Sequence, residues 1–137
     1  MRAVKSFVPA LLFVLVAACG GADASSARTA APAPTDEVRA LVVQYGLGGG
    51  EKDVAGEAFY NLDRRAVPGL LEVARDPATS HDDLETIIFI ASTYVPDPEI
   101  FDALRTRAQA MPDPADRELR IRLIDALSAN AVAAQPQ

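Results

Sequence analysis

Side chains that could act as nucleophiles or carry protons near neutral pH are scarce in this sequence. The 137 residues include one cysteine, Cys19, and one histidine, His81. A single cysteine can form neither an internal disulfide nor a multi-cysteine zinc site. His81 stands in the first turn of an expected helix, where side chains are usually solvated, and the sequence places no nucleophile or second histidine to act with it. We therefore predict no catalytic residue, no metal site and no other cofactor.

The glycine-rich stretch GLGGGEKD at residues 46–53 invites comparison with a phosphate-binding loop. The match fails because Lys52 follows Glu51 rather than a glycine, and because Asp53 stands where a serine or threonine would hold magnesium. No strand is expected before it. We interpret the stretch as a helix end followed by a flexible turn.

Carboxylates occur in two groups, one of Asp82, Asp83 and Glu85 and the other of Asp53 and Glu57. Acid–base catalysis needs two carboxyl groups in different environments across a pocket, and the spacing of an EF-hand calcium loop is absent. These acids fall in or near the first turns of expected helices, where they complement the positive end of the helix dipole. We interpret them as acids that stabilise the N-termini of these helices.

The formal net charge of −6 argues against a nucleic-acid partner, because a duplex repels a surface without a basic stripe. Arg117, Arg120 and Arg122 lie together on the last expected helix, but neighbouring acids offset their field. Glu118 and Arg122 are four residues apart in the favourable order, so we expect them to pair. The minor alternative is that these arginines form a basic patch that binds anionic lipid or a partner.

The first nineteen residues explain why Cys19 stands where it does. Arg2 and Lys5 give a positive start, an apolar run follows over residues 7–18, and small residues come next. This layout is typical of a secretory signal peptide. The run contains Pro9 and is too short to span a bilayer, which needs about 20 residues. Removal of this leader would leave 11 of the 13 basic residues against 19 acidic ones, a net charge of −8.

Residues 16–19, Val-Ala-Ala-Cys, resemble the lipobox of bacterial lipoproteins. The resemblance implies that the Cys19 thiol receives a diacylglyceryl group, that the leader is cut before it, and that the new amino terminus is acylated with a fatty acid such as palmitate. It also implies a cell-envelope location, facing out of the cytoplasm, with Gly20 compatible with the outer membrane if the source has two membranes. The alternative is ordinary secretion with a free thiol, cut near residues 22–24.

Composition divides the chain into four segments. Residues 1–18 are the expected signal peptide, and residues 19–35 are the acylated cysteine and a tether of small residues and proline. Such a segment cannot bury enough apolar surface to offset its ordering entropy, so we expect it to be disordered. A helical domain is expected over residues 36–130 and a second disordered segment, the tail, over residues 131–137.

Every long apolar pattern between the tether and the tail is helical. The i, i+3, i+4, i+7 spacing occurs at Val38, Leu41, Val42 and Tyr45, and again 29 positions later at Val67, Leu70, Leu71 and Ala74. Capping residues are expected at Thr35, Ser80, Asp97 and Asp113. We predict six helices, near residues 36–45, 51–63, 66–75, 81–94, 98–110 and 114–129. The fourth is apolar nearly all round, so we expect it to be central and buried.

Pairing these helices gives three helix-turn-helix units with a period near 30 residues, which favours a short all-α solenoid. The middle unit, AVPGLLEVARDP at residues 66–77, resembles a HEAT repeat, with Pro68 early in its first helix and Asp76 closing the turn. The other two units lack this proline–aspartate pair, and the period is shorter than in full HEAT repeats. An irregular helical bundle is the alternative.

We therefore expect a membrane-anchored, non-enzymatic lipoprotein that binds an envelope protein as a scaffold or accessory subunit. In a solenoid, the second helix of each pair lines the concave surface. The candidate partner-binding residues on these helices are Glu57, Tyr60, Asn61, Thr86, Thr93, Glu118, Arg122 and Asp125. The main alternative is a carrier of a small molecule or lipid, with a cavity near Phe59, Phe89 and Phe101. The third hypothesis is that the protein is an enzyme.

Overall fold

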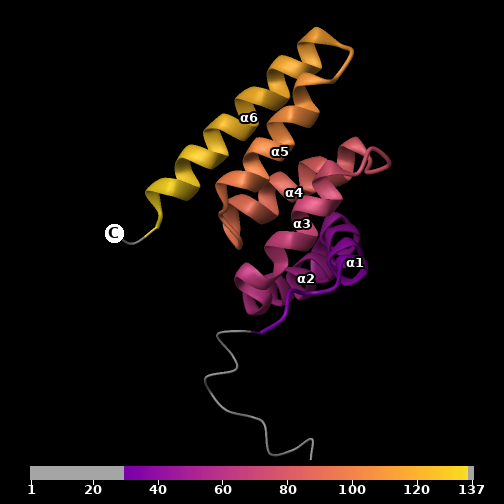
Figure 1. The fold of residues 1–137 in the computed structure, drawn as a ribbon, viewed down its shortest axis with the longest axis vertical. Helices are drawn as coiled ribbons and strands as arrows, with labels where there is room; N and C mark the ends of the chain where they lie inside the picture. The colour runs from indigo at the N-terminus through magenta and orange to yellow at the C-terminus, as the bar shows by residue number, and fades with distance from the viewer. Residues whose placement is uncertain (1–29, 136–137) are drawn as a thin grey trace, which may run out of the picture. The chain divides into compact units, whose positions relative to one another are not determined.

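The computed structural model is all-helical over the part it describes, residues 30–135, and those residues contain no strand. Cys19, the signal peptide, most of the tether and residues 136–137 lie outside the described residues. The helices are α1 (Thr35–Gly46), α2 (Gly49–Leu62), the 3-10 helix η3 (Asp63–Ala66), α3 (Val67–Arg75), α4 (His81–Thr93), α5 (Pro98–Gln109) and α6 (Pro114–Ala133) (Figure 1).

One predicted boundary between helices differs from the structure. Residues 49–75 are helical without interruption, because η3 joins α2 directly to α3, and the described residues therefore form five continuous helical stretches. The chain changes direction at Asp63, whose φ of 49° and ψ of −131° are a conformation that glycine adopts more readily. A sharp backbone bend thus replaces the expected loop.

Three of the four predicted helix caps are confirmed. The side chains of Ser80, Asp97 and Asp113 accept hydrogen bonds from the backbone N–H groups at the starts of α4, α5 and α6. The prediction for Thr35 is wrong, because Thr35 is already the first residue of α1 and no side chain caps that helix. Its hydroxyl instead donates to Glu72 Oε2 of α3 at 2.5 Å.

Order extends beyond the predicted limits of the helical domain at both ends. Ala33, expected in the disordered tether, is buried, and its N–H donates to the carbonyl of Arg65 at 3.0 Å. Helix α6 continues to Ala133, and Ala131, expected in the disordered tail, is also buried. Backbone pairing with η3 and packing against the core order these residues, and neither contact is local in sequence.

Helix α4 has the central, buried position that its composition predicts. Its side chains Leu84, Ile87, Ile88, Ile90 and Ala91 are buried, and the helix packs against α1, α5 and α6. Burial on several sides explains why residues 87–91 in its middle form an uninterrupted apolar run. Phe89 is the exception, because 40% of its surface is exposed.

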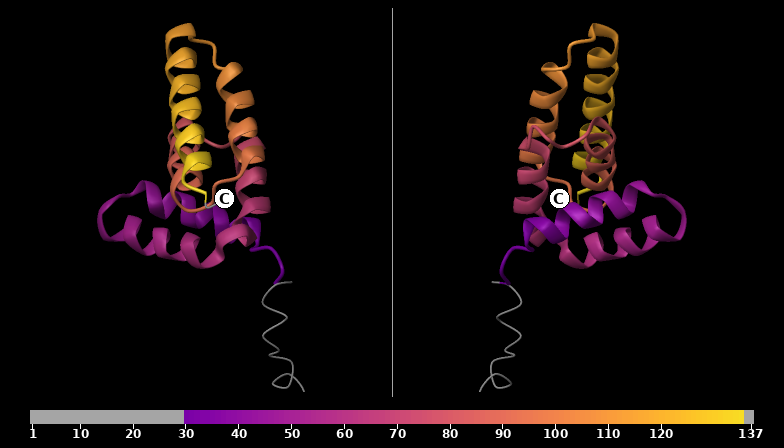
Figure 2. Two further views of the ribbon diagram at one scale, coloured as in Figure 1. Left: turned by 90° about the vertical axis from the view of Figure 1, so that its left-hand side faces the viewer. Right: turned by 90° about the vertical axis from the view of Figure 1, so that its right-hand side faces the viewer.

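Helices α3 and α6 both pack on α5, whereas α2 packs mainly on α1 and η3. Helix α3 packs on α1 and on α5, and α6 packs on α5 and on α4. Helix α2 packs mainly on α1 and η3, and the α1–α2 hairpin (residues 35–62) lies across the direction of α5 and α6 (Figure 2). The first helix pair is therefore turned relative to the last.

Two glycines allow helices to approach closely on either side of the α1–α2 hairpin. A methyl group on Gly69 of α3 would lie 2.7 Å from Val38 Cγ2 of α1, and Val38 is fully buried. A methyl group on Gly56 of α2 would lie 2.5 Å from the hydroxyl oxygen of Tyr94, which follows α4. Only glycine permits both contacts without displacement of the neighbouring side chain.

We expect Gly69→Ala to destabilise the fold by about 1–3 kcal/mol, because the added methyl group overpacks a contact with a rigid, buried valine. Gly50→Ala is the matched control, since nothing lies within 4 Å of its methyl position in α2, and it should be neutral or stabilising by up to about 1 kcal/mol. Urea unfolding of the two variants and the parent measures both effects. Equal stability of the two variants would contradict the close packing of α1 on α3.

Candidate functional site

The eight candidate partner-binding residues fall into two groups in the structure. Glu57, Tyr60 and Asn61 lie together on α2 and are exposed. The other five lie on α4 and α6, which pack on each other: Thr86, Thr93, Glu118, Arg122 and Asp125. Because α2 packs mainly on α1 and η3, the two groups do not follow one continuous row of second helices.

Most of the α4–α6 group is already engaged within the molecule. Glu118 and Arg122 form the ion pair that their spacing predicts. Asp125 pairs with Arg105 of α5, whose Nη2 donates to Asp125 Oδ1 at 2.8 Å. Thr86 is half-buried and lies near Gly46. Among the five, only Thr93 is exposed without a side-chain bond in the described part of the chain.

The α2 group belongs to a larger surface, the α2 outer face, which we define as Asp53, Val54, Glu57, Tyr60 and Asn61. All five are exposed, with Tyr60 at 73% and Val54 at 58% of their full surface. The three- and four-residue spacing places them on one side of the helix. The opposite side of α2, formed by Ala55, Gly56 and Phe59, is buried.

Exposed apolar side chains concentrate on the α1–α2 hairpin. Seven large apolar side chains are exposed among the described residues, and four of them belong to this hairpin or its turn: Val43, Leu47, Val54 and Tyr60. Val43 is exposed on α1, and Leu47 is exposed in the turn that follows this helix. Contiguous exposed apolar surface on a small domain marks an interaction site more often than scattered residues do.

The same hairpin is acidic. Residues 35–63 contain six acidic and two basic residues, a net charge of −4. None of the six acids forms an ion pair with a described residue: Asp36, Glu37, Glu51, Asp53, Glu57 and Asp63. Of the two bases, Lys52 lies with its Nζ 5.2 Å from the centroid of the Tyr45 ring, and Arg39 pairs with Asp76 of the α3–α4 turn. The negative charge of the hairpin is thus largely uncompensated.

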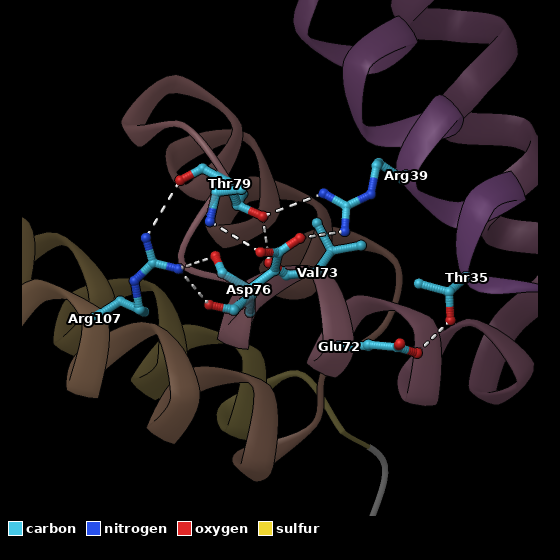
Figure 3. A network of polar contacts seen from close by, with 9 residues as sticks. Thr35, Arg39, Glu72, Val73, Asp76, Thr79 and Arg107 are labelled. Atoms are coloured by element: carbon cyan, nitrogen blue, oxygen red, sulfur yellow. Dashed lines mark hydrogen bonds and ion pairs between the residues drawn. The ribbon is translucent and has the colours of Figure 1, made fainter.

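A polar network between helices fixes the hairpin in place (Figure 3). Arg39 of α1 donates to Asp76 Oδ2 at 2.7 Å and to the hydroxyl of Thr79 at 3.4 Å. From the other side, Arg107 of α5 donates to the backbone carbonyls of Ala74, Asp76 and Thr79. The α3–α4 turn is therefore held between α1 and α5.

Contacts in and near this network shift the pKa values of two side chains, Asp76 and Tyr45. The N–H of Ala78 and, to a lesser degree, the guanidinium of Arg39 hold the pKa of Asp76 below its ordinary value. At the other end of α1, burial, followed by the neighbouring Tyr94, raises the pKa of Tyr45 to about 12. The neutral ring of Tyr45 lies beneath the ammonium group of Lys52.

Several of the other groups that could suggest chemistry have structural roles. The glycine-rich stretch ends α1 and begins α2, as predicted, with positive φ at Gly48 and Gly49. His81 is exposed at the first position of α4, and Glu85 accepts a bond from Arg120 at 2.6 Å. Arg117 donates to backbone carbonyls. The described residues include no group of three His, Cys, Asp or Glu side chains that could hold a metal ion.

A groove between α5 and α6 was missed by sequence reasoning. It has a volume of about 510 Å³ and is lined by Pro96, Phe101, Ser128 and Val132, among others. Its walls come from segments about 30 residues apart, so no local pattern could indicate it. Of the three phenylalanines expected to surround a cavity, only Phe101 borders it, because Phe59 is fully buried in the core and Phe89 is partly exposed on α4.

Helices α1 to α6 include no segment that is both long and apolar enough to cross a bilayer.

Comparison with known proteins gives no match: no protein-family model matches the chain, and neither a curated protein nor a solved structure matches it significantly.

We expect Asp76→Asn to lower stability at neutral pH, with the loss shrinking as the pH falls. A carboxylate whose pKa is lowered by folding stabilises the native state above its unfolded pKa, and this stabilisation disappears as the pH drops through the folded value. The stability difference between parent and variant should thus be largest near pH 7 and decline below about pH 4. Urea unfolding of the parent and the variant across this range measures the difference, and a difference that stays constant with pH would contradict this role of Asp76.

Proposed function

We propose that this protein is a bacterial lipoprotein that binds another protein of the cell envelope as a non-enzymatic scaffold or accessory subunit. The leader and its lipobox support anchoring through Cys19. The α2 outer face supports protein binding, and this is the observation that carries the proposal. A large aromatic side chain, Tyr60, is 73% exposed there beside Val54, on a helix whose outer side no other described element covers.

We further propose that the helical unit is an abbreviated HEAT-like stack whose first pair has turned. The packing of α3 between α1 and α5, and of α4 on α6, supports this arrangement because the three first helices adjoin in order and two of the three second helices adjoin each other. The bend at Asp63 and the close contact of Gly69 with Val38 account for the departure of α2 from the stack. The turn exposes the outer side of α2.

Anchoring would give this binding surface a physical advantage. Two or three acyl chains hold a protein firmly in one leaflet, whereas a single chain gives only marginal binding. A short tether then confines the domain near the membrane and raises its effective concentration toward a partner in the same envelope. Affinity in solution can therefore be modest while occupancy at the membrane is high.

The α5–α6 groove supports a second candidate function, the carriage of a small apolar molecule. Its volume of about 510 Å³ lies in the range of ligand pockets, and Phe101, Ala131 and Val132 make part of its wall apolar. Two features weigh against it. The groove is lined by the charged side chain of Arg105, which pairs with Asp125, and Val132 at its edge is 65% exposed, so the groove encloses a ligand poorly.

We expect the full-length protein, expressed in a bacterium and extracted from membranes with mild detergent, to begin at Cys19 and to carry diacylglyceryl and fatty acyl groups by intact mass spectrometry. In-cell cross-linking should join it to an envelope protein. Cys19→Ala is the control, and it should lose both the added mass and most of the cross-linked product. An intact leader or a free thiol on the parent would refute the anchor, and a parent without cross-linked protein would refute the scaffold.

A further inference from the structure

The α2 outer face is a helix surface against which no other described helix packs. Helix α2 uses Ala55, Gly56 and Phe59 to pack against α1, η3 and Tyr94, and its outer side meets no described element. A surface helix in a small domain ordinarily turns mainly polar residues outward. Here Val54 and Tyr60 are turned outward instead, and both are more than half exposed.

The negative charge on this face indicates which kind of partner would bind it. Asp53 and Glu57 are four residues apart, so they form an acidic row along α2, and neither has an ion-pair partner in the described chain. The nearest base in sequence, Lys52, lies over the Tyr45 ring instead. Val54 and Tyr60 flank the acidic row on either side, by the rotation of an α-helix. The face thus presents apolar side chains around an uncompensated negative stripe.

We propose that the α2 outer face binds a basic amphipathic segment of a protein partner, whose cations pair with Asp53 and Glu57 and whose apolar residues cover Val54 and Tyr60. This inference rests on the proposed protein-binding function and names the partner's chemistry. Tyrosine is a frequent anchor at such interfaces because its ring buries a large area while its hydroxyl stays satisfied. Charge complementarity would speed encounter and set the choice of partner.

Two other occupants fit the same face poorly. A second copy of this chain would bring the acidic rows of two α2 helices together, and like charges in an interface are unfavourable. A lipid surface rich in anionic headgroups would repel the hairpin, whose net charge is −4 over residues 35–63. A cationic protein segment satisfies both the charge and the apolar side chains.

The test uses the mature chain, residues 19–137 with Cys19→Ser, which keeps the whole folded unit and needs no detergent. The probe is a synthetic helical peptide about as long as α2, with leucines on one side and lysines on the other. Fluorescence anisotropy of the labelled peptide should show binding that weakens as the ionic strength rises from about 0.01 M to about 1 M, because the Debye length falls from about 30 Å to about 3 Å. A peptide with glutamate in place of lysine should not bind.

Variants locate the binding surface. Tyr60→Ala, and separately the double change Asp53→Asn with Glu57→Gln, should each weaken binding of the lysine peptide at least about tenfold, as expected for an interface anchor. Leu119→Ala is the matched control, because Leu119 is 70% exposed on α6 and should leave binding unchanged. Circular dichroism should show that all these variants remain folded.

Several outcomes would overturn the inference: no binding of the lysine peptide, equal binding of the glutamate peptide, or equal loss on Leu119→Ala. A dimer in sedimentation that Tyr60→Ala dissolves, or binding to anionic vesicles that needs Tyr60, would assign the face to another occupant. The in-cell cross-link separates this failure from that of the proposed function. If Tyr60→Ala retains the cross-linked envelope protein, the scaffold role stands and its surface lies elsewhere.

Discussion

Two arginines hold the α3–α4 turn from opposite sides and thereby connect α1 and α5 through it. Arg39 reaches the turn from α1 through the side chains of Asp76 and Thr79, and Arg107 reaches it from α5 through backbone carbonyls. Helix carbonyls at a C-terminus otherwise lack partners, so a guanidinium with five donors satisfies several of them at once. A short turn thereby joins the first, middle and last parts of the domain (Figure 3).

This clamp explains how a small domain can leave part of its apolar surface uncovered. With α1 bonded to the α3–α4 turn and packed closely on α3 at Gly69, the α1–α2 hairpin is held in an orientation that leaves the outer side of α2 exposed. The bend at Asp63 then sends the chain back into α3 immediately. Val54 and Tyr60 stay exposed because the helices that might cover them are held elsewhere. Rigid presentation of this kind reduces the entropy lost on binding.

Local sequence patterns predict most of the helices but little of their arrangement. Apolar spacing and the caps at Ser80, Asp97 and Asp113 are determined within a few residues, so they could be recognised without a structure. Tyr60 was named as an outward-facing residue by analogy with a solenoid rather than from a local pattern, and it is 73% exposed on α2. The hairpin's orientation depends on Gly69 meeting Val38 across about 30 residues, and the α5–α6 groove likewise depends on distant segments. No periodicity in a single sequence encodes such pairings.

Native-state hydrogen exchange on the mature chain tests most directly whether the clamp makes the hairpin and the remaining helices one cooperative unit. Amides of Val42 and Phe59 in the hairpin, and of Ile88 in α4, are all on fully or almost fully buried residues. If the clamp holds, these amides exchange through the same global opening and give the same free energy. Exchange of Val42 and Phe59 at a clearly lower free energy than Ile88 would show that the hairpin opens alone, and the fixed presentation of the α2 outer face would be contradicted.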